Sequence, residues 1–225
     1  MGLARSLRRL GRDRCGAGGA AVLLVMLSVF TAVQPVEAQE PPDALQAYRD
    51  GQYQRAVQIT LEEIAAMPRN MDAYSVLGWS LLALGRDQDA ADYATRALAV
   101  SPFDARIIHI AGTAHFNLGN DLDALRLLEQ YAQIQPNGPQ IGPVYFMMGE
   151  IFIRFGEYHH ADIALTTALH HRDNNPQWWS RLAYAREQAA DYQHALAAYD
   201  RALQLNPGLQ TAVQGRARVQ QQLGG

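Results

Sequence analysis

Apolar side chains recur with a helical period along most of the chain, in units that repeat every 34 residues. Residues 71–104 show the unit most clearly, because apolar positions follow the i, i+3, i+4, i+7 spacing in two runs separated by a turn at Gly85. Such a stripe is typical of a helix that buries one face. Each unit is therefore predicted to form two helices joined by a tight turn.

Four positions of the unit are filled by the same kind of residue in nearly every copy. Small side chains let two helix backbones approach closely, and a proline after the second helix prevents that helix from continuing. Ala190 replaces the turn glycine in the last copy, and Asp173 replaces the proline in the fourth. The other residues are Gly78, Gly112, Gly149 and Ala183 in the first helix, Gly51, Gly85, Gly119 and Gly156 in the turn, Ala56, Ala90, Ala124, Ala161 and Ala195 in the second helix, and Pro68, Pro102, Pro136 and Pro207 at the end.

This combination resembles the tetratricopeptide repeat family, and the resemblance covers about three quarters of the chain. It implies an all-α fold, a right-handed α-solenoid of about five stacked helix–turn–helix repeats whose first helices line a concave groove. A single helix pair cannot bury its own apolar face, so stacked neighbours supply the core. The predicted repeats are 71–104, 105–138, 142–175 and 176–209, preceded by a degenerate first repeat at 39–70.

Two further segments are predicted within the repeat region. Residues 139–141 are an insertion between the third and fourth repeats, and the surrounding run from Pro136 to Pro143 is too rich in proline and glycine to be helix interior. It is either a spacer or a loop that shapes the groove. Residues 210–225 form a capping helix and tail, with an expected apolar side of Ala212, Val213, Ala217, Val219 and Leu223.

The first 38 residues have the composition of a secretory signal peptide. Five arginines precede a 14-residue apolar stretch from Ala20 to Val33, and Val36 to Ala38 resembles a cleavage site. The stretch is short for a membrane span, which needs about 20 residues. The protein is thus predicted to be exported, periplasmic or envelope-associated, and to contact a membrane only if this segment is an uncleaved anchor.

The composition of residues 39–225 excludes several classes of function. This part carries 14 arginines and 20 acidic residues, for a formal charge of −6, and no cysteine. Nucleic-acid binding needs clustered positive charge, so no nucleic-acid partner is expected. Without cysteine there is no disulfide or thiol chemistry, which is compatible with an oxidising compartment.

No catalytic or cofactor motif occurs in residues 39–225, so the protein is predicted not to be an enzyme and to need no cofactor. Histidines are the remaining candidates for a metal site. His159–His160 and His170–His171 lie about 15 Å apart along one predicted helix, too far to share an ion. His160 and His194 occupy the same repeat position, but zinc takes at least three protein ligands. No metal site is therefore predicted.

The resemblance implies that certain first-helix positions face the concave groove. Carried over to this chain they are aromatic and apolar, and the lysine and asparagine clamp of chaperone-docking members is missing. For Trp79, Phe116 and Phe146, packing between helices is the alternative interpretation. Trp179 is expected in the core and Trp178 at the surface. The predicted partner-binding residues are Ser75, Trp79, His109, Phe116, Phe146, Met147, Glu150 and Tyr184.

These features favour a non-catalytic interaction scaffold that binds a peptide or helix of a protein partner, because aromatic side chains in a concave surface are common peptide anchors. The alternative is a carrier of a small apolar ligand, or an accessory subunit of an envelope transporter. The partner's identity is left open by the sequence.

Overall fold

The computed structural model describes residues 43–224, and all regular structure in this range is helical, which confirms the predicted all-α class. The predicted signal segment lies outside the described residues. Within them, no helix combines the length and apolar character needed to cross a membrane. The helices are α1 (Ala44–Arg49), α2 (Tyr53–Ala66), α3 (Met71–Ala83), α4 (Asp87–Val100), α5 (Ala105–Leu118), α6 (Asp121–Ile134), α7 (Ile141–Arg154), α8 (Tyr158–His171), α9 (Pro176–Gln188), α10 (Tyr192–Leu205) and α11 (Gln210–Gly224).

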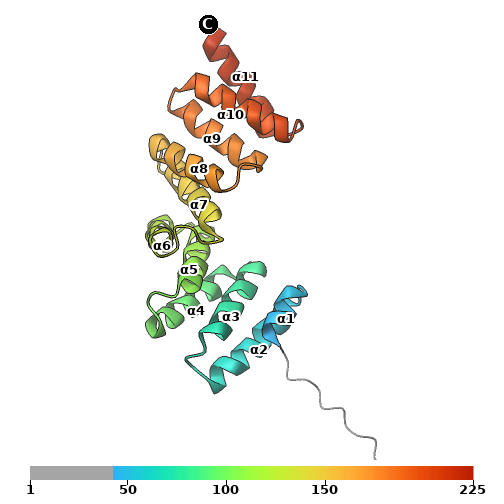
Figure 1. The fold of residues 1–225 in the computed structure, drawn as a ribbon, viewed down its shortest axis with the longest axis vertical. Coiled ribbons are helices and arrows are strands. Elements are labelled where there is room, and N and C mark those ends of the chain that lie inside the picture. Colours follow the sequence, from blue (N-terminus) through green and yellow to red (C-terminus); the bar gives the residue numbers. More distant parts are fainter. Residues whose placement is uncertain (1–42, 225) are drawn as a thin grey trace, which may run out of the picture. The chain divides into compact units, whose positions relative to one another are not determined.

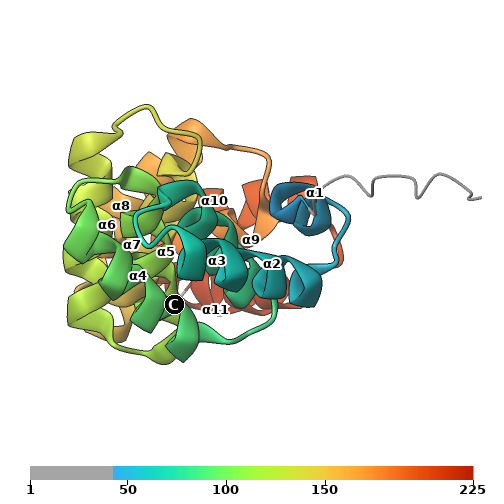
Figure 2. The ribbon, with the colours of Figure 1, turned by 90° about the horizontal axis from the view of Figure 1, so that it is seen from below.

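The helices form five consecutive pairs, from α1–α2 to α9–α10, and α11 covers the end of the array by packing on α9 and α10. Each first helix also contacts the first helix of the next pair. Figure 1 shows the pairs stacked in chain order, and Figure 2 looks along the stack. This arrangement confirms the predicted α-solenoid of about five repeats with a terminal helix.

Asparagine and aspartate side chains cap the first helices of the pairs, except for α7. Asn70, Asp104 and Asn175 each accept a backbone N–H from the first turn of α3, α5 and α9, which satisfies donors that the helix leaves unbonded. Between the two helices of a pair, the turn residue has a φ of 68° to 76° at the four glycines. Ala190 has a φ of 60° at the same position of the last pair, which is unfavourable for a residue with a Cβ.

The small residues of the repeat lie at close helix contacts. The recurring alanines of the second helices have 0% exposure in all five repeats. A Cβ on Gly78 would lie 2.7 Å from Ile110 Cγ2, and one on Gly149 would lie 2.6 Å from Leu165 Cγ. Larger side chains at these positions would push neighbouring helices apart, since the interior is close-packed.

The inserted segment is shorter than its prolines suggested. Helix α7 begins at Ile141, so Gly142 and Pro143 belong to its first turn and the loop comprises residues 135–140. The first backbone N–H groups of a helix have no partner within it, so proline costs nothing there. The prediction that the whole run to Pro143 lies outside a helix was wrong for this reason.

The two neighbouring tryptophans of α9 differ from the prediction, since Trp178 is the more deeply buried of the two. Trp178 is buried at 7% exposure, stacked on Phe146 with ring centroids 5.0 Å apart, whereas Trp179 is only half-buried. Trp179 Nε1 donates a hydrogen bond to the Asp173 carbonyl at 2.7 Å. The Asp173 carbonyl belongs to the connection between α8 and α9, so the repeat pattern does not predict this hydrogen bond.

The terminal helix buries a different stripe from the one expected. Its buried residues are Ala212, Gly215 and Val219, while Val213 and Leu223 are 42% and 44% exposed. Gly215 has no side chain to mark it as a core position, and it is buried because Tyr199 of α10 fills the space beside it.

Candidate functional site

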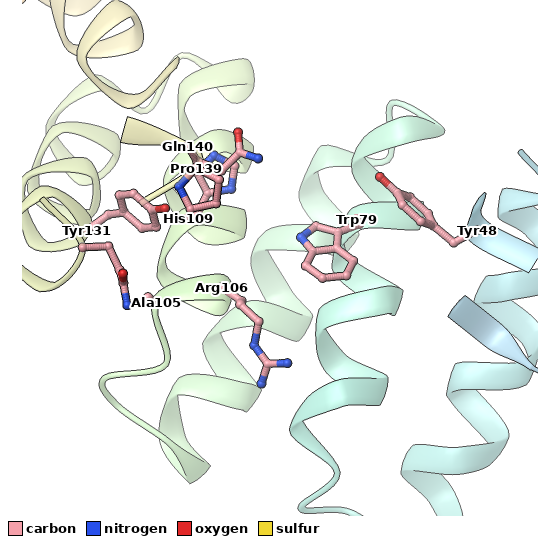
Figure 3. Close-up of a pocket in the computed structure, with 9 residues that line it drawn as sticks. Tyr48, Trp79, Ala105, Arg106, His109, Tyr131, Pro139 and Gln140 are labelled. Carbon is pink, nitrogen blue, oxygen red and sulfur yellow. The ribbon is translucent and has the colours of Figure 1, made fainter. Parts of the chain in front are cut away.

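A cleft with a volume of about 560 Å³ lies on α1, α3, α5, α6 and the loop 135–140. We call it the aromatic cleft. Figure 3 shows Tyr48 and Trp79 on one side of it and His109, Tyr131, Pro139 and Gln140 on the other. Its lining is completed by Ala105, Arg106 and Gln135, so the complete set is Tyr48, Trp79, Ala105, Arg106, His109, Tyr131, Gln135, Pro139 and Gln140.

Aromatic rings from successive repeats form the two sides of this cleft. The Tyr48 ring lies 5.9 Å from that of Trp79, and the His109 ring lies 5.5 Å from that of Tyr131. Trp79 is half-buried and packs against the core at its base. The rings therefore present flat apolar surface that is already held in place before any ligand arrives.

His109 is neutral in this setting. Burial lowers the pKa of its imidazole to about 4, because a charged ring would lose its hydration against Tyr131. At neutral pH the side of the cleft around His109 and Tyr131 carries no charge from histidine. Its polar groups are the imidazole nitrogens, the tyrosine hydroxyl and the amides of Gln135 and Gln140.

Arg106, in the first turn of α5, is held by two carboxylates. Its guanidinium lies 2.8 Å from Asp104 Oδ2 and 2.6 Å from Asp72 Oδ1, which links α5 to α3. Partial burial favours a higher pKa for Asp104, but the hydrogen bonds and charge of Arg106 outweigh it and hold that pKa below its ordinary value. Arg106 is thus a fixed, neutralised group at the edge of the cleft.

The inserted loop closes one end of the aromatic cleft. Pro139 and Gln140 line it, and Gly138 packs so closely on Tyr131 that a Cβ would lie 2.6 Å from the tyrosine oxygen. This contact fixes the loop against α6. Of the two roles considered from the sequence, the structure places the loop at the groove rather than in a separate spacer.

A second cleft, of about 360 Å³, lies beside the first on α1, α2, α3 and α5. It shares Trp79 and Arg106 with the aromatic cleft, and we call it the acidic cleft because Asp43, Glu63 and Asp72 line it. Burial raises the pKa of Glu63, and the nearby negative charge of Asp43 raises it further.

Three of the predicted partner-binding residues lie at these clefts. Trp79 lines both and His109 lines the aromatic cleft. Ser75 lines the acidic cleft, but it is 1% exposed and its hydroxyl donates to the Met71 carbonyl at 2.8 Å, so it has little to offer a ligand.

The other five predicted residues line neither of these two clefts. Met147 is 8% exposed and lies in the core, and Phe146 stacks on Trp178. The guanidinium of Arg154 covers Phe116 at 4.5 Å from the ring centroid. Arg181 pairs with Glu150 at 2.6 Å and covers Tyr184 at 5.1 Å. At Phe116, Phe146 and Glu150 the contacting side chain comes from the next repeat, so the pattern within one repeat does not reveal the contact.

Of the nine residues that line the aromatic cleft, only Trp79 and His109 were among the predicted partner-binding residues. Tyr48 stands at the twelfth position of the first repeat, one of the positions assigned to the groove in the later repeats, and extending that assignment to the degenerate repeat would have found it. Tyr131 belongs to a second helix, and Gln135, Pro139 and Gln140 belong to the loop. The groove positions implied by the resemblance lie on first helices, so they include neither Tyr131 nor the three loop residues.

The histidines do not assemble a metal site. Within residues 43–224 no group of three or more His, Cys, Asp or Glu side chains could hold an ion. His160 and His194 each pair with an acidic residue of their own turn, Glu157 at 2.9 Å and Asp191 at 2.8 Å, and both are exposed.

Models of the tetratricopeptide repeat match residues 37–105 and 176–209 of the chain. Comparison with curated protein sequences finds no match. Solved structures of MamA share the fold. One covers 75% of this chain and 96% of its own, with a TM-score of 0.66 and 17% identity. MamA AMB-1 covers 73% and 96%, with a TM-score of 0.65 and 22% identity. MamA from Desulfovibrio magneticus RS-1 covers 74% and 93%, with a TM-score of 0.66 and 16% identity. At these identities the likeness concerns the fold alone.

Proposed function

The chain belongs to the tetratricopeptide repeat family, and on this premise we propose that it is a non-catalytic scaffold that holds a segment of a protein partner in the aromatic cleft. Repeat arrays of this kind expose an extended surface to partners while their core is formed by neighbouring repeats.

The observation that carries this proposal is the aromatic lining of the cleft. Four rings from three repeats, with the inserted loop across one end, enclose about 560 Å³. Rigid aromatic side chains are the residues that most often dominate the binding energy of protein interfaces, because they bury a large apolar area at a small cost in conformational entropy. The cleft is therefore suited to receive one or two large side chains of an extended or helical segment.

A cross-linked pull-down with the full-length chain from envelope extract tests the proposal. Ala105→Trp fills the cleft without removing any core packing, since Ala105 is half-buried at the start of α5. Trp79→Ala removes one aromatic side of the cleft. Both variants are expected to lower partner recovery at least about 10-fold, the loss typical of a removed interface anchor.

Trp179→Ala is the matched control, because Trp179 is a half-buried tryptophan that lines a different cleft, on α8 and α9. Circular dichroism establishes that all three variants keep their helicity. Equal recovery of the partner by all three would place binding outside the aromatic cleft and contradict the proposal.

A small apolar ligand is the second candidate occupant, since clefts of 300 to 1,000 Å³ are typical of small-molecule sites. Native mass spectrometry of gently purified protein separates the two. A bound lipid or other small molecule that disappears in Ala105→Trp favours the carrier function, and protein that is empty but retains its partner favours the scaffold.

The proposed location is the periplasm or cell envelope, and it rests on the composition of residues 1–38. Fractionation and N-terminal sequencing of the protein from its native cells test it. A mature chain that begins near Gln39 in the periplasmic fraction is expected. Intact protein in the membrane fraction indicates an uncleaved anchor, and protein in the cytoplasm contradicts export.

A further inference from the structure

The aromatic and acidic clefts are adjacent, because Trp79 and Arg106 line both of them. We call the two together the joined groove. One end of it is apolar and uncharged around His109 and Tyr131, and the other end carries carboxylates from α1, α2 and α3. The chemistry of a bound segment must match both ends.

The acidic end contains more negative charge than its own cations neutralise. Arg106 is the one cation that lines it, and its guanidinium is already engaged by Asp72 and Asp104. Neither Asp43 nor Glu63 forms an ion pair with any of the described residues. Asp43 accepts only the Gln46 backbone N–H, at 3.0 Å, and Glu63 forms no side-chain hydrogen bond among the described residues.

The half-buried Glu63 is also repelled by the charge of the exposed Asp43. The two carboxylates line the same cleft, and Glu63 is held where burial and Asp43 both disfavour its charge. A cation placed between them would relieve both effects, since opposite charge favours the ionised carboxylates and completes their hydrogen bonding. An acidic segment would meet repulsion at the same place.

We propose that the segment bound in the joined groove is basic and apolar: a lysine or arginine lies between Asp43 and Glu63, and a neighbouring aromatic or large aliphatic side chain enters the aromatic cleft beside Trp79. This inference rests on the proposed function and names the chemistry of the partner. Positive charge guides the segment to the acidic end, and the rings supply most of the contact area.

Selection from a phage-displayed library of random dodecapeptides on the immobilised full-length chain tests this inference. The expected sequences combine Lys or Arg with Trp, Phe, Leu or Met. Affinities of the synthesised peptides are then measured by fluorescence polarisation at two salt concentrations. Binding is expected to weaken at the higher salt, because exposed charge pairs are screened.

A double-mutant cycle assigns the charge to its partners. Asp43→Asn with Glu63→Gln removes both charges while Asn keeps the cap of α1. We expect this variant to bind a selected peptide at least about 10-fold more weakly, and to be indifferent to replacement of the peptide's Lys or Arg by Gln. Glu62→Gln is the matched control, since Glu62 is the exposed neighbour of Glu63 on α2 and lines neither cleft. It should bind like the wild type.

The outcomes separate the two proposals. One outcome is that the selected peptides bind Trp79→Ala and Ala105→Trp more weakly than the wild type, yet contain no basic residues and bind the double variant normally. That result overturns the basic partner and leaves the scaffold function standing. A set rich in Asp and Glu also overturns it. Failure to select any peptide, or binding that ignores the Trp79 and Ala105 variants, overturns both.

Discussion

Gly215 of α11 lies directly against the phenol ring of Tyr199 of α10, so that a Cβ at residue 215 would overlap the Cζ and Oη atoms. Tyr199 is 1% exposed, and its hydroxyl donates to Glu187 Oε2 at 2.6 Å. The same carboxylate accepts two hydrogen bonds from Arg218 of α11, at 2.7 and 2.9 Å. This close contact and ion pair, together with the Arg216–Asp200 ion pair and the buried Ala212 and Val219, hold the terminal helix in place.

Gly215→Ala is expected to detach or shift α11. The Tyr199 ring cannot move away without losing its hydrogen bond, so the added methyl group should lower the free energy of unfolding by about 1 to 3 kcal/mol. Urea denaturation measures the loss, and hydrogen exchange should show faster opening of residues 210–224 first. Gln214→Ala, an exposed change on the same helix, should leave both measurements unaltered. Unchanged protection in Gly215→Ala would mean that this contact does not hold the helix.

Ala190→Gly is expected to stabilise the array. Ala190 has a φ of 60°, a conformation that costs a non-glycine residue about 1 to 2 kcal/mol. Glycine removes this cost, but its greater conformational entropy in the unfolded chain offsets part of the stabilisation. The net increase should be about 0.5 to 1 kcal/mol in the free energy of unfolding.

The reciprocal change, at the corresponding turn of the second repeat, provides the control. Gly85 has a φ of 68°, and no atom of another residue lies within 4 Å of the place that a Cβ would take, so Gly85→Ala changes backbone strain alone. It should destabilise by about 1 kcal/mol. Equal melting temperatures for the wild type and both variants would show that these turns relax without cost.

Stability is expected to fall as the pH drops from 6.5 towards 4 because of His109. The folded pKa of about 4 lies below the ordinary value of 6.5, so the unfolded chain binds the extra proton in this range and the folded chain does not. The contribution is fully present above pH 6.5, is lost progressively down to about pH 4, and amounts to on the order of 2 to 3 kcal/mol.

Urea denaturation at several pH values measures this effect. His109→Gln should flatten the profile between pH 6.5 and 4, whereas His159→Gln, at an exposed residue, should retain the slope. The lowered pKa values of Asp104, Glu187 and Asp191 act at lower pH, where acidic groups titrate. If the pH dependence of stability persists in His109→Gln, it arises from other titratable groups.

Gly78→Arg should loosen the contact between the second and third repeats. A side chain at residue 78 points at Ile110, whose Cγ2 would lie 2.7 Å from the new Cβ, and an arginine also brings charge into a buried site. The expected loss is about 1 to 3 kcal/mol or more, seen as a lower melting temperature. Ala83→Arg, at an exposed position of the same helix, should melt like the wild type.

The 34-residue periodicity was sufficient to predict the helix pairs, the turns and the buried alanines. These features depend on contacts that every repeat makes in the same way, so the position of a residue within the repeat is enough to predict them. Ala56, Ala90, Ala124, Ala161 and Ala195 are all fully buried for this reason.

Only the tertiary structure decided which groove positions are open. Trp79 and Phe146 both occupy positions that the repeat pattern assigns to the groove, yet Trp79 lines a cleft while Phe146 stacks on Trp178. The difference arises from neighbours: the loop 135–140 holds Pro139 and Gln140 across the cleft from Trp79, and α9 brings a tryptophan against Phe146. Side-chain exposure at such positions depends on residues of other repeats, and a local periodicity carries no information about how those residues fill the shared space.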